Sequence, residues 1–206
     1  MCIRDRSRAV EKVQSDMVRS QAEGMQAQVQ SYLNRARIAA QRESLLARTE
    51  LEPALERLVR VMRRLNPEKE FHLSVFPPGV ALAMEQQDVE ETVGNLLENA
   101  ARFCETGVWI TATPTSGPQS GEGETARRSW VEVAVEDDGP GLEPDQIHEA
   151  MKRGRRLDES KPGAGLGLSI VREITGEYHG SVELTRGARG GLRAQLLLPS
   201  VAKEGP

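Results

Sequence analysis

The chain has 206 residues, a formal net charge of −4, and 38% hydrophobic but only 3% aromatic residues. Its length allows one full domain with a helical extension. The acidic balance argues against a nucleic-acid-binding protein, which would need a basic face. Two cysteines and three histidines exclude a disulfide scaffold and argue against a tetrahedral zinc site. The sequence contains no apolar run of about 18 residues, the length that spans a membrane.

Residues 7–46 predict one long helix. Proline is absent there, and apolar side chains recur in steps of three and four, as at Val10, Val13 and Met17. At about 1.5 Å per residue the helix would be about 60 Å long. Its apolar stripe is too narrow to be buried without a partner helix. An ordinary docked helix and a dimerising or bundle helix both remain open.

From residue 51 onward the pattern alternates between helices and strands. Helices are predicted over 51–65, 89–103 and 169–177, and strands over 71–76, 80–84, 108–113, 130–135, 181–185 and 192–198. A long hairpin loop is predicted over 114–129, where Gly, Ser, Thr and Pro dominate, and a turn over 186–191. Strand pairs separated by helices predict one sheet with the helices packed on one face.

Asn95 and Asn99 form the first candidate cluster. Their spacing of four residues on a predicted helix puts both carboxamides on one face. Carboxamide oxygens are hard ligands that suit Mg²⁺. Two solvated asparagines are the alternative, and the spacing alone does not decide between them.

The second cluster, Glu136 to Gly141, ends an apolar strand. A carboxylate at this position can accept a hydrogen bond from an exocyclic amine, and the two glycines allow the backbone to approach a flat ligand. A plain acidic turn is the alternative.

The third cluster is the glycine-rich segment Gly163–Leu168, which precedes a predicted helix. Free N–H groups and the helix dipole make such a segment an anion cradle. It matches neither the dinucleotide fingerprint nor a Walker A loop. The preceding segment, residues 151–161, is locally basic. We therefore expect it to be a lid that faces a triphosphate.

The order of these clusters resembles the N, G1 and G2 boxes of the ATP-binding domain of sensor histidine kinases, in the family shared with gyrase, the Hsp90 chaperones and MutL. The resemblance covers residues 51–198, nearly all of the globular part. It is most detailed toward PhoQ-type sensor kinases, in the segments QSYLNRA, GNLLENAARFC, VEDDGPGL, KRGRRLDESKPGAGLGL and VREITGEYHG.

The resemblance implies a Bergerat-type fold: an α+β sandwich with a mixed, largely antiparallel sheet and helices on one face, preceded by a long helix of a dimerisation hairpin. It assigns residues 7–47 to the second helix of that hairpin, whose first helix is absent. Residues 50–199 would be the ATP-binding catalytic domain.

The resemblance also implies the site. Asp137 would accept from the adenine amine, and Asn95 and Asn99 would hold Mg²⁺ on the phosphates. Arg102 would contact phosphate, and Phe103 would pack on the nucleotide. The further implied ATP-binding residues are Gly139, Gly141, Leu142, Arg156, Lys161, Gly163, Ala164, Gly165, Leu166, Gly167 and Leu168. Ala164 stands where PhoQ-like relatives carry Gln, so one side-chain contact to the metal or the phosphates would be lost.

Asn95 bears on the reaction. The hydrolysing relatives place a Glu there as a general base, whereas an Asn cannot take a proton at neutral pH. Phosphoryl transfer needs positioning and charge stabilisation, so Asn95 favours a kinase. The acceptor should be a histidine on the hairpin's first helix. None of the three histidines resembles such an acceptor; they are His72, His148 and His179.

We therefore expect a C-terminal piece of a sensor kinase that uses ATP and Mg²⁺. The γ-phosphoryl of ATP would be transferred to the acceptor histidine and then relayed to a response regulator. The resemblance further implies a homodimer through the hairpin helices, and a cytoplasmic domain of a bacterial inner-membrane protein. The piece itself would be soluble and attached to the membrane only through missing upstream segments. A non-catalytic nucleotide-binding or interaction module is the alternative, and Asn95 and the short chain disfavour a clamp-type ATPase.

Overall fold

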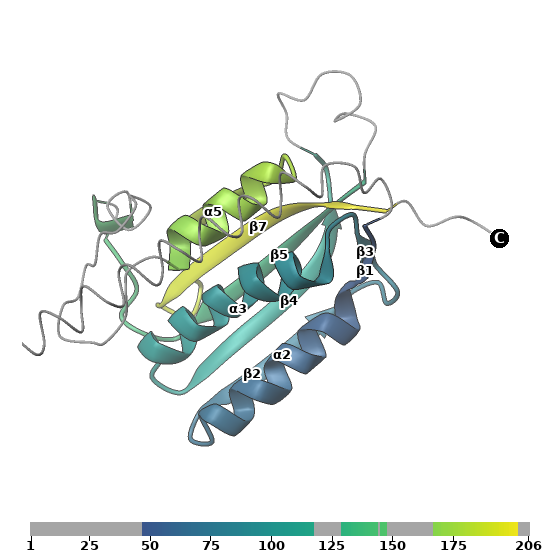
Figure 1. The fold of residues 1–206 in the computed structure, drawn as a ribbon. Helices are drawn as coiled ribbons and strands as arrows, with labels where there is room; N and C mark the ends of the chain where they lie inside the picture. Colours follow the sequence, from purple (N-terminus) through teal and green to yellow (C-terminus); the bar gives the residue numbers. More distant parts are fainter. Residues whose placement is uncertain (1–46, 118–128, 144, 148–166, 202–206) are drawn as a thin grey trace, which may run out of the picture.

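The computed structural model describes residues 47–117, 129–143, 145–147 and 167–201. Three helices lie against one face of a seven-stranded sheet (Figure 1). The helices are α2 (Leu51–Leu65), α3 (Gln86–Phe103) and α5 (Gly167–Glu177). The strands are β1 (Thr49–Glu50), β2 (Glu70–Val75), β3 (Ala81–Leu82), β4 (Gly107–Thr115), β5 (Ser129–Asp137), β6 (Ser181–Arg186) and β7 (Leu192–Ser200). The helix predicted over residues 7–46 lies outside the described residues.

The sheet runs in the order β1-β3-β7-β5-β4-β2, with β6 paired to β7. Strands β2 and β4 pair in parallel and are connected through α3, whereas the other strand pairs of the described residues are antiparallel. The mixed, largely antiparallel sheet with helices on one face is therefore confirmed. The long β4, β5 and β7 form its centre (Figure 1).

The core lies between the helices and this face of the sheet. Helices α2 and α3 bury one apolar stripe each, as the helical spacing predicts. The largest fully buried side chains of this core are Leu51, Leu55, Leu82, Met84, Leu97, Ile110, Leu196 and Leu198. Burying each such side chain contributes about 1.5–3 kcal/mol. This packing fixes α3, which carries the two candidate asparagines, against the centre of the sheet.

Several predicted helices and strands begin or end at other residues in the structure. Pro114 and Thr115 belong to β4 and not to the predicted loop, because the antiparallel ladder continues to the pair Thr115 and Trp130. Proline is tolerated there because the pairing of β4 with β2 ends at Ala112, so that within the described residues the far end of β4 pairs only with β5. Helix α5 begins at Gly167, two residues before the predicted Ser169.

Two further points concern the described part of the chain. Strand β1 was not predicted, because two residues are too short to show a period. Within the described residues, no helix has the length and apolar character needed to cross a membrane.

Candidate functional site

Three consecutive carboxylates at the end of β5 have three different environments. Glu136 and Asp137 are the last residues of the strand, so their side chains point to opposite faces of the sheet. Both are buried, whereas Asp138, just past the strand, is only half-buried. The structure thus distinguishes acidic groups that the sequence presents as one cluster.

Asp137 lies on the helix side and is 4% exposed. Its Oδ1 accepts hydrogen bonds from the N–H groups of Gly139, at 2.9 Å, and Leu192, at 3.3 Å. Burial raises the pKa of Asp137, although these two hydrogen bonds oppose the effect. No Lys or Arg of the described residues forms an ion pair with it. A buried carboxylate of this kind is suited to accept a hydrogen bond from a neutral amine.

Glycines form the walls around Asp137. A Cβ at Gly139 would overlap the carbonyl oxygen of Phe103, and one at Gly191 would overlap Oδ1 of Asp137 itself. Gly141 has φ +70°, in the left-handed region that favours glycine. A Cβ at Gly139 would also lie 3.0 Å from Oδ1 of Asp137, whereas Gly141 lies against the carbonyl oxygens of Gly190 and Gly191. Gly191 was missed, although the adjacent Gly190 and Gly191 were a signal that we interpreted only as a turn.

Glu136 belongs to the second candidate cluster, but its role was not predicted from the sequence. Its Oε1 accepts from the backbone N–H of Arg189 at 2.9 Å, and its Oε2 pairs with the guanidinium groups of Arg189 and Arg193, both at 3.3 Å. Burial alone would raise the pKa of Glu136, but these contacts lower it below its usual value. Glu136 therefore holds the turn between β6 and β7, and that turn carries Gly191 to Asp137.

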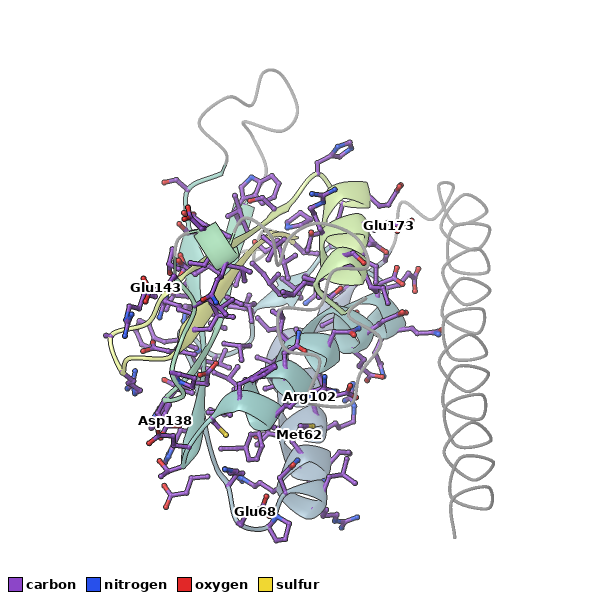
Figure 2. The ribbon with its side chains drawn as sticks, turned by 90° about the vertical axis from the view of Figure 1, so that its left-hand side faces the viewer. Met62, Glu68, Arg102, Asp138, Glu143 and Glu173 are labelled. Carbon is purple, nitrogen blue, oxygen red and sulfur yellow. The ribbon has the colours of Figure 1, made fainter. Side chains whose placement is uncertain are left out.

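Asp138 connects β5 to the segment between α3 and β4. It accepts hydrogen bonds from the N–H groups of Glu105, Thr106 and Gly107 at 2.9–3.2 Å, and from the hydroxyl of Thr106. Burial alone would raise the pKa of Asp138, but these donors lower it to about 2. Figure 2 shows Asp138 on the sheet side and Arg102 on the helix side of the domain. The structure gives Asp138 a stabilising role at the end of β5.

We expect stability to fall in acid through Asp138. The pKa of its carboxyl is about 2 in the folded protein and about 3.9 in an unfolded chain. The folded state therefore binds fewer protons, and the contribution is present above about pH 4 and lost as the pH falls toward 2. Asp138→Asn should lower the free energy of unfolding at pH 7 by about 1 kcal/mol, a value reduced for solvent screening of a half-buried group.

Urea unfolding between pH 7 and 3, followed by tryptophan fluorescence, measures this effect. The difference between wild type and Asp138→Asn should shrink as the pH falls. Asp145→Asn removes an exposed carboxylate and is the matched control. A difference that stays constant down to pH 3 would contradict the assignment.

The two candidate asparagines meet the start of α5. A Cβ at Gly167 would lie 3.0 Å from Oδ1 of Asn95 and 3.5 Å from Nδ2 of Asn99. Asn95 donates from Nδ2 to the carbonyl oxygen of Glu91 at 2.7 Å, which leaves its oxygen directed to the Gly167 side. Both asparagines are half-buried, while Glu98 is exposed. The oxygens of this pair are chemically suited to Mg²⁺, and the first N–H groups of α5 are suited to an anion.

The remaining predicted residues divide into two groups. Arg102 is exposed on the last turn of α3, Phe103 is half-buried with its carbonyl beside Gly139, and Leu142 and Leu168 pack partly against the core. The predicted residues outside the described part of the chain are Arg156, Lys161, Gly163, Ala164, Gly165 and Leu166, and the basic segment over 151–161 lies there too.

Comparisons with known proteins identify the family of the chain. A family model described as "Histidine kinase-, DNA gyrase B-, and HSP90-like ATPase" matches residues 84–202. The sensor protein kinase CarS of Pseudomonas aeruginosa is 40% identical over 123 residues, which make up 60% of this chain and 25% of CarS. The sensor protein PhoQ of Escherichia coli K12 is 31% identical over 174 residues, 82% of this chain and 33% of PhoQ.

Among solved structures, full-length ShkA in complex with AMPPNP has a TM-score of 0.65 at 23% identity, covering 92% of this chain and 39% of ShkA. That likeness shows the fold. The chain spans a quarter to a third of the length of CarS and PhoQ. The predicted resemblance to sensor kinases is confirmed. The match to the family model covers more than half of the chain, so the chain belongs to the family of histidine kinase-, DNA gyrase B- and HSP90-like ATPases.

Proposed function

We propose that this chain is the ATP-binding catalytic part of a sensor histidine kinase. The observation that carries the proposal is the buried, glycine-lined carboxylate of Asp137, which lies in the same domain as the contact of Gly167 with Asn95 and Asn99. The first arrangement suits an adenine amine, and the second suits a metal-bound phosphate chain. Family membership and the likeness to ShkA, whose structure contains AMPPNP, support the same conclusion.

Each group has a separate task in this proposal. Asp137 accepts a hydrogen bond from the adenine amine, and Gly139, Gly141 and Gly191 allow the backbone segments around this carboxylate to pack closely. The oxygens of Asn95 and Asn99 hold Mg²⁺, which offsets negative charge on the phosphates. The N-terminus of α5 orients the phosphates through its N–H groups. Arg102 lies exposed at the end of α3, as a phosphate contact would require.

The chemistry we propose is transfer of the γ-phosphoryl rather than hydrolysis. Asn95 cannot accept a proton from water at neutral pH. Glu98 is exposed on the next face of α3 and does not replace it. Transfer to a preformed nucleophile needs positioning and charge stabilisation, which carboxamides and backbone N–H groups provide.

The acceptor is a histidine on a hairpin helix outside these 206 residues. His72 lies in β2 and stacks on Trp109 at 5.2 Å, and His179 lies in the turn before β6. Neither of these two is on a helix face that an acceptor needs, and His148 lies outside the described residues. The whole kinase would dimerise through its hairpin helices, pass the phosphoryl group to a response regulator, and place this domain in the cytoplasm of a membrane-anchored sensor.

Two measurements test the proposal. An ATP analogue should bind the chain more tightly with Mg²⁺ than with EDTA. Radiolabelled ATP should then label an added acceptor hairpin, and the label should be stable to base and labile to acid. The chain alone should stay unlabelled. Label on this chain alone would overturn the assignment of an external acceptor.

A non-catalytic nucleotide-binding module is the second candidate, because Ala164 stands where PhoQ-like relatives carry Gln. It predicts analogue binding without label on any acceptor hairpin. Restoring the side chain with Ala164→Gln separates the two. If the residue limits transfer, this variant should raise the rate of labelling while analogue affinity changes little.

A further inference from the structure

Helices α3 and α5 are held together at two places. Near the start of α5, Gly167 lies against Asn95 and Asn99. Just past its end, the hydroxyl of Tyr178 donates to Oδ2 of Asp88 at 2.6 Å. Asp88 lies on the first turn of α3, so the two helices run antiparallel. The two contacts are about 16 Å apart along α5, at about 1.5 Å per residue.

The contact between Tyr178 and Asp88 is buried and directional. Asp88 is 1% exposed, and the same Tyr178 hydroxyl accepts from the backbone N–H of Glu85 at 3.4 Å. Between the two contacts α5 packs through Val171 and Ile174, which are both buried. Apolar packing is non-directional, whereas a short hydrogen bond to a carboxyl oxygen fixes one geometry.

We propose that Tyr178 and Asp88 are positioning residues for the metal and phosphate half of the nucleotide site. Their hydrogen bond sets the register of α5 on α3, and that register places the first N–H groups of α5 at Asn95 and Asn99. The proposal rests on the function proposed above. The adenine half does not depend on this register, because Asp137 and Gly191 belong to β5 and to the turn between β6 and β7.

This separation gives the test a specific readout. The dissociation constant of AMPPNP is measured for the full chain with Mg²⁺ and with EDTA, and the ratio of the two is the magnesium gain. Tyr178→Phe removes the donor and should reduce the magnesium gain about 10-fold, while affinity in EDTA changes less than twofold. Asp88→Ala should do the same, and the double variant should lose no more than either single one.

Two further variants separate positioning from general stability. Asp88→Asn keeps an acceptor for the Tyr178 hydroxyl and should retain most of the magnesium gain. If Tyr178→Phe does not fold, the loss of magnesium gain in Asp88→Ala, compared with its retention in Asp88→Asn, provides the test. Thr92→Val is the matched control, since Thr92 is fully buried on the same helix and its hydroxyl has no hydrogen-bond partner in the described structure. It should leave the gain unchanged.

The outcomes are distinct. An unchanged magnesium gain in Tyr178→Phe, with only a lower urea midpoint, would overturn the proposal and leave the pair a purely structural contact. An equal loss of affinity with Mg²⁺ and with EDTA would also overturn it. If the wild-type chain binds no nucleotide, the proposed function itself fails, and the positioning role fails with it.

Discussion

Asp137→Asn is expected to weaken ATP binding about 100-fold, because a hydrogen bond to a charged group is worth about 1.5–3 kcal/mol and a mismatched donor adds a further cost. The carboxylate accepts from Gly139 and Leu192 through Oδ1. An amide in its place presents its NH₂ either to those N–H groups or to the adenine amine. Titration of a fluorescent ATP analogue measures the loss.

Asp137→Asn should weaken ATP binding without lowering the free energy of unfolding. Burial raises the pKa of this carboxyl in the folded state, so its charged form opposes folding at neutral pH and its contribution to stability is present only in acid. The variant should thus unfold at a urea concentration no lower than wild type at pH 7. Asp138→Asn is the neighbouring control, with lower stability and unchanged affinity of the folded protein.

A second nucleotide adds a check on the contact itself. ITP carries a carbonyl where ATP carries the amine, so wild type should bind ATP much more tightly than ITP. Asp137→Asn should lose most of that preference. Equal affinity of wild type for the two nucleotides, or unchanged ATP affinity in the variant, would refute the assignment of Asp137 to the adenine amine.

Asn99→Ala is expected to reduce phosphoryl transfer to an acceptor hairpin about 100-fold, because a metal that is misplaced by a missing ligand no longer offsets the developing charge. Nucleotide affinity in EDTA should change little, since the adenine contacts are elsewhere. Asn95→Ala should behave similarly, as the Oδ1 of Asn95 faces the start of α5 at Gly167, where Nδ2 of Asn99 also lies. The rate of acid-labile labelling and the magnesium dependence of binding are the two measurements.

Glu98→Gln is the matched control for this experiment. Glu98 lies on α3 beside Asn99 but is exposed. Its substitution should leave both the rate of labelling and the magnesium gain unchanged. A larger effect of Glu98→Gln than of Asn99→Ala would show that the wrong face of α3 had been assigned to the metal.

Helices were the most predictable part of the fold. The apolar spacing predicted α2 over residues 51–65, which are its observed bounds, because an amphipathic stripe and the stop at Asn66-Pro67 are local signals. Strand ends were less predictable. The extension of β4 to Thr115 depends on its pairing with Trp130, and a pairing between distant residues leaves no local signal.

The site shows the same division. The motif order pointed to Asn95, Asn99, Asp137 and the glycines near them, and the structure brings Gly167 to the two asparagines. The roles of Gly191 and Glu136 were missed, because their relevance comes from the register of β7 on β5 and from the turn that Glu136 holds. Tyr178 and Asp88 were missed as well, since they are 90 residues apart in the sequence.

The sequence alone therefore determined the family, the helices and the chemical types of the candidate groups, since these depend on residue identity and short spacing. Only the tertiary structure decided which of three adjacent carboxylates faces the glycine-lined side and which one stabilises a loop. The reason is physical: alternation along a strand sends neighbours to opposite faces. Burial and partners up to 55 residues away then set opposite pKa shifts on Asp137 and Asp138.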